Sequence, residues 1–170
     1  YGVLCDHRLN GSGLATFYGS DLVAALYDRK MPALLNTQFY EIDRDVSIRK
    51  YRHKIPVLLN KDNVDASTIE AGMKVCLREF GGVVQSDRKP YRNLVRLVGI
   101  SEESHEKVVD VIIPGWNPRR AVRLPSSLIC EWILNFEPEI GTRLIANVNS
   151  GGENPEDLYF TDFEVPEGCN

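Results

Sequence analysis

The chain has 170 residues, of which 43% are hydrophobic and 26% are charged, and its formal net charge at pH 7 is −4. This composition is typical of a globular protein and excludes collagen-like and intrinsically disordered chains. No apolar run approaches the roughly 20 residues that a membrane-spanning helix needs. No basic start followed by an apolar stretch marks a signal peptide. We therefore expect a cytoplasmic protein of one ordinary domain or two small ones.

Charge is divided unevenly along the chain. Residues 1–88 carry 12 Lys/Arg and 11 Asp/Glu, whereas residues 89–170 carry 8 and 13, which gives the second half a net charge of −5. Surfaces that bind nucleic acid neutralise phosphates with basic side chains. The acidic second half therefore argues against an extended nucleic-acid interface, and we expect a local basic patch at most.

The cysteines indicate no metal site and no disulfide framework. The four cysteines are Cys5, Cys76, Cys130 and Cys169. No two of them share a CxxC spacing, and none clusters with the three histidines. Three of the four lie in or near apolar segments. We expect ordinary buried thiols in a reducing compartment.

Three short apolar runs in residues 1–82 predict buried strands. They lie at residues 2–5, 33–35 and 55–59, and runs this short and this apolar are typical of parallel strands that are covered on both faces. A helical pattern separates the first run from the second, a polar and basic linker over residues 38–54 separates the second from the third, and another helical pattern follows the third. The fold class predicted for residues 1–82 is therefore a parallel α/β sheet.

Two helices accompany these strands. Ser20 and Asp21 are suitable caps for a helix that continues to about Lys30. Asp65 or Ser67 can cap a second helix, whose apolar positions recur every three or four residues until a pair of glycines, Gly81 and Gly82, ends it.

Residues 90–170 have a different pattern of apolar and polar residues. Segments such as RNLVRLVGI, KVVDVII and TRLIANVN are strand-like, and the turn sequences PGWNP, EPEIG and SGGENP separate segments of this kind. We predict a small antiparallel β barrel or sandwich with one helix around residues 126–134. The stretch VVQSDRKPY is the expected linker between the two domains.

Each apolar run in the first domain ends near a residue whose polar side chain can take part in phosphoryl chemistry. Asp6 follows the first, Thr37 closes the second and Lys61 follows the third. Because the carboxyl ends of parallel strands share one edge of a sheet, a carboxylate, a hydroxyl and an ammonium can meet there. This trio suits transfer of a phosphoryl group to the carboxylate of Asp6.

In these features residues 1–82 resemble the later part of a response-regulator receiver domain. Asp6-His-Arg-Leu9 resembles the segment that carries the phosphoacceptor, Thr37 in PALLNT matches the hydroxyl residue, and Lys61 in IPVLLNK matches the conserved lysine. The separations, 31 residues and then 24, are close to those of the family. The resemblance implies a partial flavodoxin-like fold with Asp6 as phosphoacceptor and as ligand of Mg²⁺.

The sequence also departs from the receiver pattern. The acidic pair after the family's first strand has no counterpart, because the chain starts at the third strand, so we expect an N-terminally incomplete domain. Asn10 and Asp62 stand where the family usually has prolines. These departures favour the hypothesis of a degenerate receiver that no longer accepts phosphate.

Two further features are candidate contacts for a partner. Four residues of the basic run RKYRHK, namely Arg49, Lys50, Tyr51 and Arg52, suit an acidic protein or, less readily, nucleic acid; the alternative is a solvated face. Trp116 in PGWNP is the tryptophan expected to be more exposed, and the alternative is a plug that closes one end of the β domain.

The sequence therefore predicts a non-enzymatic signalling protein of a two-component system. Asp6 would be phosphorylated, with Mg²⁺ as cofactor, and the β domain would contact a protein partner. A histidine kinase or an output protein would fit that partner. The alternatives are a scaffold without phosphoryl chemistry and, more weakly, a nucleic-acid-binding regulator. The sequence does not indicate an oligomeric state.

Overall fold

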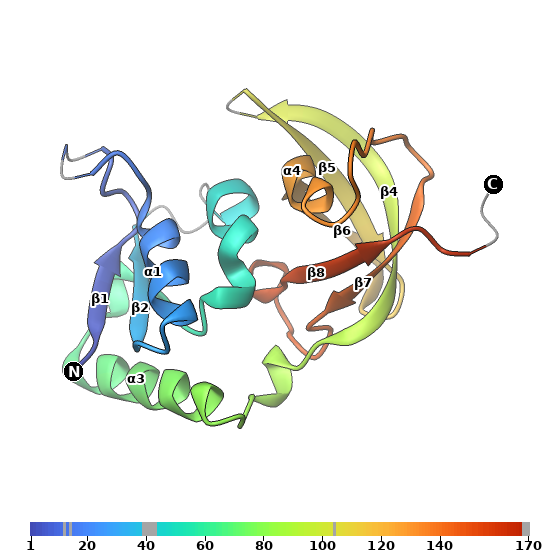
Figure 1. Ribbon diagram of the computed structural model, residues 1–170. Helices are drawn as coiled ribbons and strands as arrows, with labels where there is room; N and C mark the ends of the chain where they lie inside the picture. The colour runs from blue at the N-terminus through green and yellow to red at the C-terminus, as the bar shows by residue number, and fades with distance from the viewer. Residues whose placement is uncertain (12, 14, 39–43, 104, 168–170) are drawn as a thin grey trace. The chain divides into compact units, whose positions relative to one another are not determined.

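The computed structural model describes residues 1–11, 13, 15–38, 44–103 and 105–167 (Figure 1). The chain forms two compact units, Tyr1–Gln85 and Ser86–Asn170. The division falls inside the segment expected to be a linker. Each unit has its own hydrophobic core and is described by itself.

Unit 1 contains a three-stranded parallel sheet. Its strands are β1 (Val3–Asp6), β2 (Ala33–Thr37) and β3 (Leu58–Asn60), in the order β1-β2-β3. This confirms the parallel α/β layout predicted from the apolar runs. The third strand is shorter than predicted, because the chain is still in a helical turn up to Lys54 and Pro56 has no N–H to donate to a ladder.

One face of this sheet is covered by α1 (Gly19–Asp28) and by two successive helical turns, Arg44–Ile48 and Arg49–Lys54. The core on this face joins the sheet to α1 and to the turns, and its members are Cys5, Val23, Leu26, Ala33, Leu35, Ile48 and Ile55. Part of the segment predicted to be a polar linker is therefore helical and contributes Ile48 to the core.

The helix α3 (Ala66–Phe80) covers the opposite face. Successive strand residues point to opposite sides, and Leu34 faces Gly72 of α3 while Leu35 belongs to the α1 core. Asp65 caps α3 by accepting a hydrogen bond from the Thr68 N–H (2.7 Å). The helix ends before Gly81, and Gly82 adopts a positive φ of 86°. The predicted cap and stop of this helix are confirmed.

Unit 2 contains one five-stranded antiparallel sheet. Its strands lie in the order β6-β5-β4-β7-β8, and their bounds are β4 (Tyr91–Glu103), β5 (Glu106–Ile113), β6 (Asn117–Pro125), β7 (Arg143–Val148) and β8 (Phe160–Glu164). A short helix, α4 (Ser126–Cys130), follows β6 and packs on the core of this unit. The strands form one sheet, so the predicted antiparallel fold is confirmed while its sandwich version is not.

Alternation along β4 and β7 separates the core of unit 2 from a solvent face. Val95 and Leu97 are fully buried, whereas Leu94, which precedes Val95, and Arg96, which lies between the two, are exposed. Three irregularities in strand register, one of them between Leu97 and Gly99, bend the sheet. Among the described residues, no helix is both long and apolar enough to cross a membrane.

Candidate functional site

The candidate site lies at the carboxyl ends of the three parallel strands of unit 1. Asp6 is the last residue of β1, and Lys61 directly follows β3. The Lys61 ammonium donates a hydrogen bond to Oδ2 of the Asp6 carboxylate and forms an ion pair with it. Both side chains remain accessible, at 39% exposed for Asp6 and 37% for Lys61. Two groups predicted to meet at this edge are therefore in direct contact.

Strand order explains why this contact spans the whole sheet. The strand β2 lies between β1 and β3, with Asp6 in register with Asn36 and Thr37 in register with Asn60. A short helical turn, Lys61–Asn63, begins where β3 ends. It is fixed by the Asn60 side chain, which accepts a hydrogen bond from the Asp62 N–H (3.1 Å). This turn places Lys61 at the sheet edge, within reach of Asp6.

The second oxygen of Asp6 is also bound. Oδ1 accepts a hydrogen bond from the backbone N–H of Arg8 (3.2 Å). Partial desolvation on its own would raise the pKa of Asp6. The hydrogen bonds from Lys61 and Arg8, together with the positive charge of Lys61, outweigh it and bring the pKa below its usual value. Asp6 is therefore an ionised carboxylate at neutral pH.

Gly19 fixes the start of α1 against the end of β1. Its N–H donates to the His7 carbonyl oxygen (2.7 Å), and a Cβ atom at this position would collide with the backbone carbonyl of Asp6. The glycine is therefore needed for close approach, because any side chain would push the helix away from the strand end. Gly19 is the first residue of α1, one position before the cap suggested by the sequence.

Thr37 ends β2, the strand that separates Asp6 from Lys61. It is 1% exposed, in contrast to the accessible pair on either side of it. The structure thus places the three predicted residues at the ends of three adjacent strands and joins two of them directly. A role for the Thr37 hydroxyl stays a prediction.

His7 directly follows β1 and is packed on the α1 side of unit 1. It is fully buried, its Nε2 lies 2.9 Å from the Ser47 hydroxyl, and its ring stacks on Tyr18 with centroids 5.1 Å apart. Ser47 belongs to the helical turns on the α1 side. The ring of His7 is thus held by these contacts, and its charge is the last of the causes that lower the pKa of Asp6.

Asp6 is the residue predicted to bind Mg²⁺. Among them, no group of three or more His, Cys, Asp or Glu side chains is placed to hold a metal ion. Asp6 is the one carboxylate at the strand ends predicted to bind Mg²⁺, and both of its oxygens already accept hydrogen bonds. Mg²⁺ usually needs one or two carboxylates together with waters or phosphate oxygens. Because a single carboxylate can be enough, binding of Mg²⁺ at Asp6 stays a prediction.

The basic run is not an evenly exposed face. Arg49 and Arg52, both proposed as partner contacts, are 1% and 5% exposed. Arg49 pairs with Asp45 (3.5 Å), and Arg52 donates to the Ile55 carbonyl oxygen. This corrects the prediction, because guanidinium groups held in this way are not presented to a partner. Partner binding by Lys50 and Tyr51, which are half-buried, stays a prediction.

The two tryptophans are placed the other way round from the prediction. Trp116 is half-buried and packs on the core of unit 2, and its indole N–H donates to the Gly152 carbonyl oxygen (2.7 Å). Trp132 is the more exposed, at 47%. This packing against the core is closer to the alternative interpretation of Trp116 than to an exposed contact for a partner.

Comparisons of the chain with protein-family models, with characterised proteins and with solved structures found no match. The candidate site therefore rests on its own geometry.

Sequence reasoning missed three contributors to this geometry. Asn36 lies beside Asp6 in the sheet, Arg8 donates its N–H to the carboxylate, and Asn60 shapes the turn that carries Lys61. Two of them could have been recognised. Asp and Asn side chains commonly accept a hydrogen bond from the N–H two residues ahead, which is the pattern at Asp6-His-Arg8 and at Asn60-Lys-Asp62.

Proposed function

We propose that the chain is a signalling protein in which Asp6 is a receiver-like phosphoacceptor and unit 2 contacts a partner protein. The observation that carries the proposal is the bond between Lys61 and the Asp6 carboxylate across the whole parallel sheet. An accessible, ionised carboxylate with an ammonium on one oxygen can act as a nucleophile and can also respond to modification.

The chemistry of modification is a phosphoryl transfer. An oxygen of the Asp6 carboxylate attacks the phosphorus of a donor, such as an acyl phosphate or the phosphohistidine of a kinase. A new phosphorus–oxygen bond forms as the bond from phosphorus to the donor breaks, and the leaving group departs with that electron pair. Lys61 neutralises negative charge on the phosphoryl oxygens, and electrostatic stabilisation of this kind is usually the largest contribution to catalysis of such a step.

Modification would change the contact that now joins the two edges of the sheet. In the unmodified protein, Lys61 is held by the carboxylate of Asp6. In the acyl phosphate, the phosphoryl group carries the negative charge and lies farther from β1, so Lys61 has to move in order to pair with it. The turn Lys61–Asn63 would then bias two arrangements of unit 1, which is what a switch requires.

Binding of a phosphoryl mimic tests this proposal. The full chain is titrated with beryllofluoride in the presence of Mg²⁺, and the amide resonances of Asp6, Thr37 and Lys61 are followed by NMR. Wild type should show saturable shifts at these residues, and Asp6→Asn should show none. Equal behaviour of the two proteins would exclude Asp6 as acceptor.

A second candidate is a scaffold in which the Asp6–Lys61 pair is only structural. The geometry that favours it is the absence of further metal ligands among the described residues, together with the occupation of both carboxylate oxygens. A scaffold predicts that beryllofluoride causes no shift in wild type and that Asp6→Asn lowers thermal stability without any other effect. Nucleic-acid binding through the basic run has less support than either candidate, because Arg49 and Arg52 are buried.

A further inference from the structure

Two arginines stand side by side on the solvent face of the unit 2 sheet. Arg96 of β4 and Arg143 of β7 are paired directly across the two strands, and both are exposed. The hydrogen bond from the Leu97 N–H to the Thr142 carbonyl oxygen (2.9 Å) makes theirs a non-hydrogen-bonded pair. In such pairs opposed Cα atoms lie only about 4.5 Å apart. Their two guanidinium groups therefore leave the same face at close range.

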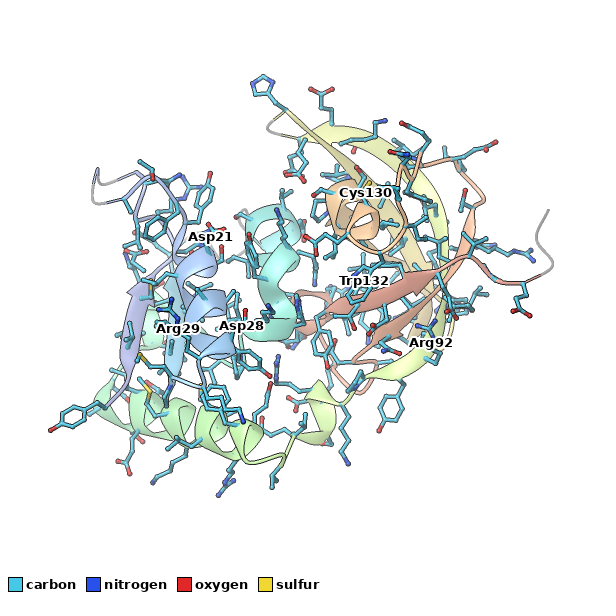
Figure 2. The ribbon with its side chains drawn as sticks, in the orientation of Figure 1. Asp21, Asp28, Arg29, Arg92, Cys130 and Trp132 are labelled. Atoms are coloured by element: carbon cyan, nitrogen blue, oxygen red, sulfur yellow. The ribbon has the colours of Figure 1, made fainter. Side chains whose placement is uncertain are left out.

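Three acidic side chains of the neighbouring strands β5 and β8 are bound to other residues. Glu164 pairs with Arg92, which is labelled on the side-chain view in Figure 2, and Asp162 accepts from the Asn147 amide (2.8 Å). On the other flank, Asp110 receives two hydrogen bonds from Arg123 (2.9 and 3.1 Å). Among the residues that the structure describes, no ion pair or hydrogen bond joins the side chain of Arg96 or Arg143 to an acid.

Aliphatic side chains flank the pair on the same face. Leu94 and Ile145 form the next outward-facing cross-strand pair; Leu94 is 38% exposed and Ile145 is half-buried. Ile112 of β5 is in register with Arg96 on the other side and is also half-buried. Like charges placed directly opposite each other destabilise a sheet. This face thus combines an unfavourable pair of cations with exposed apolar surface.

We propose that Arg96 and Arg143 form a docking site for an acidic, aliphatic segment of a partner protein. Two carboxylates of that segment neutralise the two guanidinium groups, and its aliphatic side chains cover Leu94 and Ile145. The site would suit a polypeptide better than a nucleic acid, because residues 89–170 carry a net charge of −5 that repels a long polyanion. The inference deepens the partner-contacting role proposed for unit 2 and rests on it.

A synthetic peptide tests the site in the full chain. A fluorescein-labelled peptide that alternates Glu and Val is titrated with the protein at low and at moderate salt, and binding is followed by fluorescence anisotropy. Arg96→Ala and Arg143→Ala should each weaken binding about tenfold, which is typical of a lost charge-assisted hydrogen bond. Arg92→Ala is the matched control, because its guanidinium is already bound to Glu164, and it should change the affinity less than about threefold.

A charge reversal separates loss of binding from loss of folding. Arg143→Glu replaces the repulsive pair with an attractive one, so it should keep or raise the melting temperature while it abolishes peptide binding. Peptide binding is measured without a phosphoryl donor, so its outcome does not depend on whether Asp6 accepts a phosphoryl group. The docking site and the phosphoacceptor can therefore fail independently of each other.

Three results would overturn the docking site. The first is no saturable binding of the Glu-Val peptide by wild type. The second is an equal loss in Arg92→Ala and Arg96→Ala. The third is tighter binding of a short DNA duplex, or of a peptide that alternates Lys and Val, than of the Glu-Val peptide.

Discussion

The ammonium of Lys61 binds the carboxylate of Asp6 although the two residues are 55 positions apart in the sequence and one entire strand lies between them. The contact depends on the parallel order of three strands, on the length of each strand, and on a turn that begins at Lys61 itself. A lysine free in solvent at a strand end would need none of these. The bond is therefore a property of the tertiary fold of unit 1.

Replacing Lys61 with methionine should raise the pKa of Asp6. The variant removes both the hydrogen bond and the positive charge that hold this pKa below its usual value, and leaves the desolvation that opposes them. Titration of carbon-13-labelled aspartate side chains by NMR measures the change. Lys54→Met is the matched control, since Lys54 pairs with Asp28 (2.7 Å) in the same unit. An Asp6 pKa that is the same in wild type and in Lys61→Met would contradict the role given to the ion pair.

The same variant tests how the contribution of Asp6 to stability depends on pH. A carboxyl group whose pKa is lowered on folding stabilises the protein at pH values above its unfolded pKa of about 3.9, and loses that contribution as the pH falls through its folded value. Lys61→Met should therefore be less stable than wild type at pH 7 and equally stable well below the folded pKa. Because both side chains are more than a third exposed, the difference at pH 7 should be about 0.2–1 kcal/mol.

Gly19→Ala should destabilise unit 1 and disturb the candidate site together. The added methyl group meets the backbone carbonyl of Asp6, which cannot move without moving β1. A cost of about 1–3 kcal/mol is expected for such overpacking, and urea unfolding measures it. Gly11→Ala is the control, because the nearest atom to its added Cβ is 3.8 Å away. Equal stability of the two variants would show that α1 does not depend on this contact.

Much of unit 1 could be predicted from local sequence. Short apolar runs indicated all three strands, and Asp65 and Gly81 marked the two ends of α3, because caps and glycine stops act within a few residues of the helix they limit. The meeting of Asp6 and Lys61 was also predictable, because carboxyl ends of parallel strands share an edge. These features are recorded in short stretches of chain.

Other features depended on packing that local sequence does not record. Composition alone gives Arg49 and Arg52 the same preference for solvent as Lys50, yet the first two are buried and bound to Asp45 and to the Ile55 carbonyl. Trp116 lies in a turn sequence that suggests exposure, but its indole is fixed by the Gly152 carbonyl from a distant loop. Such placements are decided by long-range partners.

Asn149→Ala should be among the most destabilising polar substitutions in unit 2. Asn149 is fully buried, its amide donates to the carbonyl oxygens of Asp87 and Asp157 (2.9 Å each), and its carbonyl oxygen accepts from the Tyr159 N–H (2.6 Å). Alanine leaves three buried backbone groups without these partners, so a loss of about 3 kcal/mol is expected. Urea unfolding provides the measurement.

Asn147→Ala is the control for that substitution. Its amide binds the exposed Asp162 carboxylate (2.8 Å), where water can replace it, so the loss should be about 1 kcal/mol or less. If both variants lost the same free energy of unfolding, the buried hydrogen bonds of Asn149 would contribute no more to stability than the exposed hydrogen bond of Asn147.

The cysteines should differ sharply in reactivity. Burial, with a smaller contribution from the charge of Asp6, raises the pKa of Cys5 to about 11, and Cys76 is fully buried. Cys130, by contrast, is exposed at the C-terminal end of α4 (Figure 2). The prediction that the cysteines are buried is thus confirmed for two and wrong for Cys130, while Cys169 lies outside the described residues. In a Cys169→Ser background, a thiol reagent should modify Cys130 rapidly in the native protein. It should modify Cys5 and Cys76 only after the protein is unfolded.

Intact-mass measurement of the full chain after incubation with acetyl phosphate and Mg²⁺ tests the central claim most directly. The account predicts that wild type gains the mass of one phosphoryl group and that Asp6→Asn gains none. It also predicts that Lys61→Met is modified more slowly. An unmodified wild-type protein, or the same mass gain in Asp6→Asn, would contradict it.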